Sequence, residues 1–216
     1  MTTREARARM LPIDPERPAP AILVTAAGVI RDSGLVAFPT ETFYGLGANA
    51  LDPEAVARVF RAKGRPADKP LLVLVDSLAM AEAVVAELPG RARQLITRYW
   101  PGPLTLILPA RSHLPAALTA GTGTIGVRVS GHPLARALAQ AAALPITAPS
   151  ANLHGDPSPR TAAEVMASLG DRVDLVLDGG VTAGGPPSTV LDLTGVEPRI
   201  VRPGAVVLTP DDLRPA

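Results

Sequence analysis

Cationic side chains crowd into one short segment, RAKGRPADKP (61–70), which holds Arg61, Lys63, Arg65 and Lys69. Helix C-termini favour nearby cations, which accounts for Arg61 and Lys63 if a helix ends at the following glycine. Arg65 and Lys69 lie beyond that helix, in a loop shaped by glycine and proline. Because lysine and arginine bind phosphate oxygens, the segment is also typical of a polyphosphate clamp of a non-Walker kind. Both interpretations stay open at this point.

Three further segments place polar or flexible residues where predicted strands end. FPTETFYGLGANA (38–50) combines threonines, a glutamate, aromatic rings and glycines, which suits a pocket-lining loop, with a structural turn as the alternative. PITAPSANLHGDPSP (145–159) offers serines and Asn152 as neutral hydrogen-bonding groups, with Asx and Ser turns as the alternative. DGGVTAGGPPSTVLDLTG (178–195) is a glycine loop that leads into a strand, and Arg202 follows in a predicted turn between two strands.

Arg128 stands inside a predicted strand, between Val127 and Val129. Side chains alternate across a strand, so Arg128 must face away from the two valines. If both faces of the sheet are covered, the guanidinium is partly buried and needs an anionic partner. That partner is either an internal carboxylate or a substrate carboxylate held by two hydrogen bonds.

Several familiar catalytic and binding motifs are absent or misplaced. GTGTIG (121–126) has the spacing of a dinucleotide-binding turn, but it precedes a strand instead of opening a helix. The sequence holds neither a Walker A motif nor a G-x-S-x-G elbow. His113, His132 and His154 lack metal-ligand spacing, and the chain has no cysteine. Thiol chemistry and a thiolate zinc site are therefore excluded.

Helical and strand patterns alternate along the chain. We predict helices at 21–33, 53–64, 77–88, 90–99, 132–143 and 161–170. We predict strands at 35–38, 71–75, 104–108, 124–130, 145–149, 173–178, 188–193, 199–201 and 205–208. This order predicts an α/β (mixed α+β) single domain with a large twisted mixed β-sheet and flanking helices.

The domain is expected to span residues 20–208, between an N-terminal arm (1–19) and a C-terminal tail (209–216). The arm is charged and contains prolines, and it reads as a loose segment or an edge strand and not as a signal peptide. No stretch of 18 uncharged apolar residues occurs, so a cytoplasmic protein without a membrane partner is expected.

The composition argues against a protein that coats nucleic acid. The 216 residues carry a formal net charge of +1, and aromatic residues make up only 3%, too few for base-stacking platforms. Of the 21 basic residues only Lys63 and Lys69 are lysines, and both fall in the cationic segment. A general lysine depletion of this kind is typical of genome composition, yet it marks two positions that merit mutation.

Six motifs in order resemble the YrdC/TsaC-type threonylcarbamoyl-AMP synthases over about residues 20–205. They are FPTETFYGLGANA, FRAKGRPADKPLLV, WPGPLTLIL, TIGVRV, ITAPSANLHGDPSP and PSTVLDLTG with RIVRPGA. The resemblance implies a YrdC-like fold with a concave positive cavity. It also implies an enzyme, a nucleotidyltransferase that forms L-threonylcarbamoyladenylate and pyrophosphate from L-threonine, bicarbonate and ATP, with magnesium. The product would feed threonylcarbamoyladenosine modification of tRNA through downstream transfer proteins.

The resemblance also implies roles for individual positions. Positions that match threonine-binding residues are Thr42, Arg128, Ala148 and Ser188. Positions that match the ATP-binding set are Lys63, Arg65, Lys69, Thr124, Ser150, Asn152, Ser158 and Arg202. Lys63 and Arg65 are the expected catalytic residues, and no residue is assigned as a metal ligand. Many longer members carry a histidine where this chain has Leu74, so one polar contact to threonine is expected to be missing or replaced by apolar surface. No second domain is expected after residue 216.

Two alternatives remain beside this hypothesis. A non-catalytic module of the same fold would hold double-stranded RNA or tRNA on its concave face, but few spare cations are available for a phosphate backbone. A weak RNA or tRNA contact of the enzyme itself is left open. A carbamoyl-transfer relative would need further catalytic parts, and 216 residues leave no room for them.

Overall fold

The computed structural model describes residues 8–214, and the strands of these residues form two mixed sheets. The smaller sheet has four strands in the order β1-β8-β2-β3. Their bounds are β1 Arg9–Pro12, β2 Val36–Pro39, β3 Tyr44–Gly47 and β8 Leu175–Asp178. β1 pairs with β8 in parallel at the edge, so the edge-strand interpretation holds for residues 9–12. Residues 1–7 of the predicted arm lie outside the described residues, as do residues 215–216 of the predicted tail.

The larger sheet has six strands in the order β10-β9-β5-β6-β4-β7. Their bounds are β4 Leu72–Leu74, β5 Leu104–Pro109, β6 Thr124–Arg128, β7 Ile146–Thr147, β9 Thr189–Asp192 and β10 Arg199–Arg202. β6 lies between β4, its parallel neighbour, and β5, its antiparallel neighbour. The central position of β6 explains why its side chains are buried on both faces.

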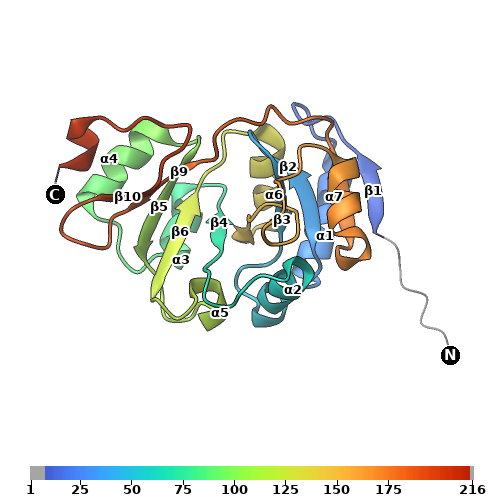
Figure 1. The fold of residues 1–216 in the computed structure, drawn as a ribbon, viewed down its shortest axis with the longest axis horizontal. Helices are drawn as coiled ribbons and strands as arrows, with labels where there is room; N and C mark the ends of the chain where they lie inside the picture. Colours follow the sequence, from blue (N-terminus) through green and yellow to red (C-terminus); the bar gives the residue numbers. More distant parts are fainter. Residues whose placement is uncertain (1–7, 215–216) are drawn as a thin grey trace.

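The two sheets meet where β3 runs beside β7. Isolated bridges join Gly45 to Ser150 and Asn49 to Ile146. The Leu46 amide donates to the Pro149 carbonyl at 2.8 Å, which extends this contact along the chain. Figure 1 shows the smaller sheet on the N-terminal side of the molecule and the larger sheet on the C-terminal side. The junction of the two sheets therefore lies in the middle of the fold.

Helices cover the sheets and complete two apolar cores. Their bounds are α1 Pro20–Arg31, α2 Pro53–Lys63, α3 Leu78–Val84, α4 Gly90–Tyr99, α5 Ala116–Thr119, α6 Pro133–Ala142 and α7 Ala162–Ser168, with 3₁₀ turns at Gly170–Arg172 and Pro210–Leu213. α1 and α6 pack together over β2 and the sheet junction and form one core. The other core contains residues of α2, α3, α4 and the larger sheet. None of the helices in residues 8–214 combines the length and apolar character needed to cross a bilayer.

The start and end of α2 follow from its local sequence. Asp52 caps the helix by accepting a hydrogen bond from the Glu54 amide at 2.9 Å, and Pro53 occupies the first turn, where no amide is needed. Gly64 ends the helix in the left-handed conformation at φ 59°, which glycine adopts without steric cost. The basic loop therefore starts at a fixed point beside the sheet junction.

The structure confirms the mixed α/β fold and changes two local predictions. The segment 38–50 was expected to run as a loop into a helix, but it contains β3. Glycines at 45 and 47 suit this strand because the Phe38 ring lies against both positions, and a Cβ at 47 would come within 2.9 Å of the ring. The strand predicted at 205–208 is wrong. Val206 bonds to the Thr189 hydroxyl instead of to a backbone ladder. Arg202 consequently ends β10 and does not stand between two strands.

A tight backbone contact at Gly204 gives a test of this packing. A Cβ at Gly204 would lie 2.2 Å from the Pro187 carbonyl oxygen and 2.5 Å from the Thr189 amide nitrogen. Backbone atoms cannot yield as a flexible side chain would, so Gly204→Ala should lower the free energy of unfolding by about 2–3 kcal/mol in urea denaturation. Gly90→Ala is the matched control, because Gly90 has no atom within 4 Å of the added methyl and begins α4. The control should be neutral or slightly stabilising, and equal losses in the two variants would contradict the packing described.

Candidate functional site

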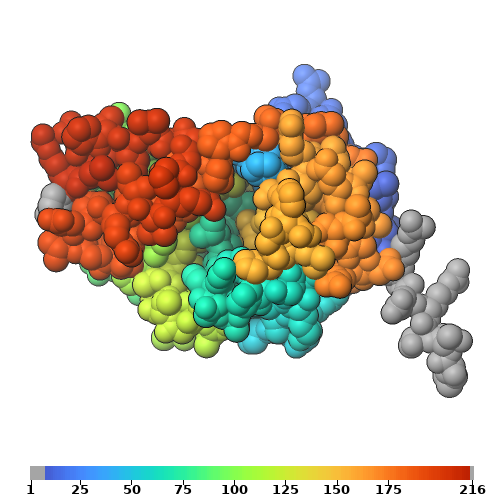
Figure 2. Space-filling model, in the orientation of Figure 1, coloured from blue at the N-terminus to red at the C-terminus, as the bar shows by residue number. Residues whose placement is uncertain are grey.

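A cavity of about 670 Å³ opens where the two sheets meet. Figure 2 shows it as a hollow at the centre of the visible face, between the C-terminal strands, α2 and the segments that follow β7. Within the described part of the chain, four cationic side chains line it, together with one carboxylate, that of Asp68. The cations are Arg65, Lys69, Arg128 and Arg202. A chain of nearly neutral net charge therefore concentrates positive charge at one place.

The floor of the cavity is one face of the larger sheet. Leu74 pairs with Arg128 across β4 and β6, and Val190 pairs with both Thr105 and Arg202. Paired residues point to the same face, so these five side chains form a row across five strands. The predicted alternation along β6 is confirmed, because Val127 and Val129 pack in the core while Arg128 lines the cavity.

Two residues further along the same strands, a second row of paired residues is apolar. It contains Leu72, Ile107 and, between them, Gly126. A Cβ at Gly126 would lie 2.4 Å from Leu72 Cδ2, so the leucine methyl occupies the space that a side chain would need. The cavity thus combines a charged row with an apolar row, a combination typical of small-molecule sites.

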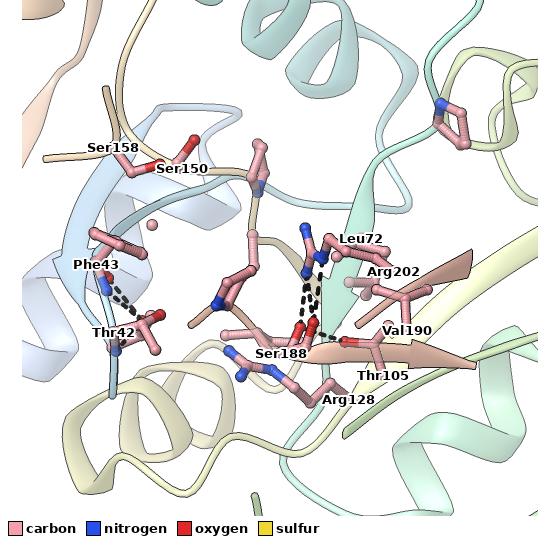
Figure 3. A pocket seen from close by; sticks show the side chains of 18 of the residues that line it. Thr42, Phe43, Leu72, Thr105, Arg128, Ser150, Ser158, Ser188, Val190 and Arg202 are labelled. Carbon is pink, nitrogen blue, oxygen red and sulfur yellow. Dashed lines mark hydrogen bonds between the residues drawn. The ribbon is translucent and has the colours of Figure 1, made fainter. Parts of the chain in front are cut away.

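Arg202, Ser188 and Thr105 form a hydrogen-bond network at one side of the floor (Figure 3). Arg202 Nη2 donates to the Ser188 carbonyl at 2.9 Å and to its hydroxyl at 3.0 Å, and this hydroxyl lies 3.0 Å from Thr105 Oγ1. Burial, and then the neighbouring Arg128, lower the pKa of the Arg202 guanidinium below its ordinary value. Two guanidinium groups that repel each other at one cavity wall favour the binding of an anion there.

Arg128 is only 8% exposed, and Glu41 supplies its counter-charge. Arg128 Nη2 lies 3.5 Å from Glu41 Oε2. Burial lowers the pKa of the Arg128 guanidinium and Glu41 opposes that effect, so the group stays charged at neutral pH. A buried charged guanidinium that borders a cavity is suited to hold a carboxylate.

Arg65 gives the basic loop its shape. Its guanidinium donates to the Lys69 carbonyl at 3.1 Å and to the Pro70 carbonyl at 2.9 Å, which folds the loop back on itself. Lys69 is exposed and its Nζ lies 3.2 Å from Nε2 of His154, so the ammonium can donate to the ring. Arg65 and Lys69 both line the cavity at its rim, where they are suited to hold phosphate groups.

Lys63 lies behind the cavity wall and does not line the cavity. It is 2% exposed, and its ammonium donates to the Ser150 carbonyl and, at 2.6 Å, to the Asn152 carbonyl. Burial, and then Arg65, lower the pKa of Lys63 to about 8. The ammonium therefore holds the segment that carries Ser150 against the end of α2, which differs from the direct phosphate contact expected from the sequence.

Nine of the twelve predicted site residues line the cavity, namely Thr42, Arg65, Lys69, Arg128, Ala148, Ser150, Ser158, Ser188 and Arg202. Figure 3 shows the Ser150 and Ser158 hydroxyls across the cavity from Ser188 and Arg202. Lys63, Thr124 and Asn152 do not line it. The Thr124 hydroxyl contacts Thr122 at 2.9 Å, at the start of β6. The Asn152 amide is buried and donates to the Leu153 and Asp156 carbonyls, each at 2.8 Å, so it shapes its own loop.

The sequence predictions missed residues that organise the site. Thr105 lines the floor and touches Ser188, but in sequence it reads as one residue of an apolar strand. Tyr44 is fully buried; its hydroxyl donates to the Gly180 carbonyl at 2.7 Å and accepts from the Gly179 amide at 3.2 Å. Burial, and then Asp178, raise the pKa of the Tyr44 hydroxyl to about 12, so it stays a donor. The aromatic position inside the segment 38–50 was a usable signal for this anchor.

Comparison with known proteins gives a family match over most of the chain. A family model, Sua5_yciO_yrdC, described as "Telomere recombination", matches residues 28–204. A threonylcarbamoyl-AMP synthase of Pyrococcus abyssi is 49% identical over 183 residues, which cover 85% of this chain and 54% of the relative. A putative threonylcarbamoyl-AMP synthase of Mycobacterium tuberculosis is 42% identical over 193 residues, which cover 89% of this chain and 88% of the relative.

A solved structure agrees with these matches. The crystal structure of Pyrococcus abyssi Sua5 in complex with L-threonine superposes with a TM-score of 0.87 at 46% identity, and covers 90% of this chain and 57% of that one. The chain thus spans about half the length of the first curated relatives that it matches. The residues matched by the family model, 28–204, include all the described residues that line the cavity.

The buried position of Lys63 predicts a pH dependence of stability. Its pKa of about 8 in the folded protein lies below the ordinary 10.5, so between these values the unfolded chain binds more protons. The free energy of unfolding of the wild type should therefore rise between about pH 8 and about pH 10.5 relative to that of Lys63→Met. Urea denaturation across this range measures the difference. Lys69→Met is the control, because it removes a lysine with an exposed side chain from the same basic segment. Parallel curves for wild type and Lys63→Met would contradict the assigned pKa of Lys63.

Proposed function

The chain belongs to the Sua5/YciO/YrdC family, and on that premise we propose that it is a threonylcarbamoyl-AMP synthase. The reaction joins L-threonine, bicarbonate and ATP to give threonylcarbamoyl-AMP, pyrophosphate and water. Relatives that bear this name, and a related structure that holds L-threonine, support the proposal. A cytoplasmic location and a role in tRNA modification, through proteins that transfer the threonylcarbamoyl group, are part of the same proposal.

One observation carries the proposal. A single cavity brings together a buried arginine suited to a carboxylate and a basic rim suited to phosphates, without a cysteine and without a histidine in its lining. Arg128 provides the first, and Arg65 and Lys69 provide the second. Such a cavity favours chemistry that depends on positioning and charge neutralisation more than on a protein nucleophile.

The proposed reaction needs no covalent intermediate with the protein. The threonine amine attacks bicarbonate carbon and releases water, which leaves a carbamate. A carbamate oxygen then attacks the α-phosphorus of ATP, the bond to the bridging oxygen breaks, and pyrophosphate leaves. In this mechanism Arg128 holds the threonine carboxylate, while Arg65, Lys69 and Arg202 neutralise the phosphates. Ser150 and Ser158 offer hydroxyls to the nucleotide, and Thr42 and Ser188 offer hydroxyls to threonine.

Magnesium fits this site as a companion of ATP better than as a resident ion. No group of three or more histidine, aspartate or glutamate side chains in residues 8–214 is arranged to hold a metal. Among the described residues that line the cavity, Asp68 is the one carboxylate, and magnesium in nucleotide sites often needs only one or two carboxylates beside the phosphates. We therefore propose MgATP as the substrate, with the ion adding charge neutralisation at the triphosphate.

The direct test is to incubate the purified protein with ATP, magnesium, L-threonine and bicarbonate and to detect the adenylate by mass spectrometry. We expect threonylcarbamoyl-AMP and pyrophosphate to appear together, and to disappear when either threonine or bicarbonate is omitted. The Mycobacterium tuberculosis relative, prepared in parallel, calibrates the conditions. Absence of product where that relative is active would exclude the synthase. Binding of RNA that weakens with salt would then favour the non-catalytic module.

Lys69 and Arg61 offer a matched pair for the phosphate assignment. Lys69 lines the cavity. Arg61 lies in the same basic segment but does not line the cavity, and its guanidinium is 2.5 Å from the Glu54 carboxylate. Lys69→Ala should lower kcat/KM for ATP roughly 30-fold, about 2 kcal/mol, at the low end for a lost phosphate contact because the exposed charge is screened. Arg61→Ala should change it less than about 3-fold. Equal effects of the two substitutions on pyrophosphate release would contradict a specific phosphate contact.

A further inference from the structure

We propose that Glu41 is a positioning residue, which joins the Thr42 turn to the end of β6 and thereby sets where Arg128 meets the amino-acid substrate. The inference rests on the proposed function for the identity of that substrate. Glu41 does not line the cavity, and it acts on the cavity through Arg128 and through its neighbour Thr42. The sequence placed it in a motif without giving it a role.

The first support comes from the turn that carries Glu41. Residues 40–43 connect β2 to β3, and the Thr40 hydroxyl donates to the Phe43 carbonyl at 2.7 Å, which closes the turn. The Gly184 amide donates to the Thr42 carbonyl at 2.9 Å on one side of the turn. Thr42 and Phe43 line the cavity, so any movement of the turn moves a cavity wall.

The second support is a pair of hydrogen bonds that cross from one sheet to the other. Glu41 Oε1 accepts from the Gly131 amide at 2.6 Å, and Oε2 accepts from the Ser130 hydroxyl at 2.8 Å. Ser130 and Gly131 follow the last residue of β6, which is Arg128. A Cβ at Gly131 would lie 3.3 Å from Glu41 Oε1, so glycine lets the carboxylate approach the backbone closely. One carboxylate thus fixes the turn of the smaller sheet to the central strand of the larger sheet.

The third support is the arrangement of the ion pair. Within residues 8–214, Glu41 is the only acidic side chain within 4 Å of the Arg128 guanidinium, and their separation is 3.5 Å. Both oxygens of Glu41 accept hydrogen bonds from Ser130 and Gly131, and the 3.5 Å contact with Arg128 is an ion pair and not a short two-bond arrangement. It balances the buried charge while leaving guanidinium N–H groups available toward the cavity.

The charge state of Glu41 suits this role. Burial alone would raise the pKa of its carboxyl group, but Arg128 and the hydrogen bonds from Ser130 and Gly131 together lower it below the ordinary value of 4.5. The group is therefore an anion at neutral pH. The neighbouring titratable groups are His132, which precedes α6, and Arg136 of α6. Arg136 donates to the Ser130 and Gly131 carbonyls at 3.1 and 3.0 Å.

Positioning and simple charge balance predict opposite effects on threonine binding. If Glu41 only offset the charge of Arg128, its removal would leave an uncompensated cation, and the threonine carboxylate would bind more tightly. If Glu41 positions Arg128 and the Thr42 turn, its removal misplaces two contacts and threonine binds more weakly. Glu41→Gln keeps one acceptor and the side-chain shape, whereas Glu41→Ala removes the whole connection.

The test measures the dissociation constant of L-threonine by calorimetry and the steady-state constants of both substrates. We expect the threonine dissociation constant and KM to rise roughly 30-fold in Glu41→Ala and roughly 5-fold in Glu41→Gln, with kcat and the KM for ATP within about 3-fold of wild type. Glu82→Gln is the matched control. This glutamate does not line the cavity, and its carboxylate lies 3.0 Å from the guanidinium of an exposed arginine, Arg93. Tighter threonine binding in Glu41→Gln, or a lower melting temperature with unchanged threonine binding in Glu41→Ala, would overturn the proposal.

A ligand-free measurement separates this inference from the proposed function. If the wild type neither binds threonine nor forms the adenylate, the synthase proposal fails, and hydrogen exchange still tests the connection itself. In the absence of ligand, Glu41→Ala should speed exchange of the Gly131 amide and of the turn amides by at least about 10-fold, while core amides of β5 keep their protection. Unchanged exchange at Gly131 would show that Glu41 does not hold the two sheets together there.

Discussion

A charged arginine buried at the end of a central strand is the constraint on which this site depends. Arg128 is 8% exposed and sits on β6, with strands on both sides. A guanidinium at that depth is costly unless an anion and hydrogen-bond acceptors compensate it. Residues 8–214 supply one anion within ion-pair distance, Glu41, and its separation of 3.5 Å leaves the cavity side of the guanidinium open. The charge of Arg128 is therefore balanced within the protein, and the guanidinium still faces the cavity.

The meeting of two sheets creates both the cavity and the means of holding its walls. β3 and β7 are joined by backbone bridges, and side chains extend the connection on either side. Lys63 ties the end of α2 to the segment after β7, and Tyr44 ties β3 to the glycine loop after β8. Glu41 ties the β2–β3 turn to the end of β6. Each of these groups is polar and largely buried, and each satisfies backbone groups that would otherwise lack partners.

The sequence predicted those features of the structure that depend on interactions between residues close together in the chain. The end of the helix at Gly64 and the alternation around Arg128 are both confirmed, because each depends on a few neighbouring residues. The basic loop was found for the same reason. The depth of Lys63 was not predictable, since a lysine in a cationic segment reads as exposed until the opposing loop is placed over it.

Contacts between residues far apart in the sequence explain the remaining differences between the predicted and the observed structure. β3 was hidden because its glycines disfavour a strand in isolation and suit it only beside the Phe38 ring. The segment 205–208 is apolar enough to suggest a strand, but the amide and the carbonyl of Val206 form hydrogen bonds with the Thr189 hydroxyl. Thr105 belongs to the site because β5 places it between Arg128 and Val190, a register that no local pattern contains. Family resemblance located most of the lining residues, and the geometry separated those at the cavity from those behind it.

We propose that one cavity holds the amino acid at Arg128 and the triphosphate at the Arg65–Lys69 rim at the same time. The decisive measurement is a crystal structure with L-threonine and a non-hydrolysable ATP analogue. We expect the threonine carboxylate within hydrogen-bond distance of the Arg128 guanidinium, and the phosphates within reach of Arg65 and Lys69. Threonine bound away from Arg128, or the nucleotide bound outside this cavity, would contradict it.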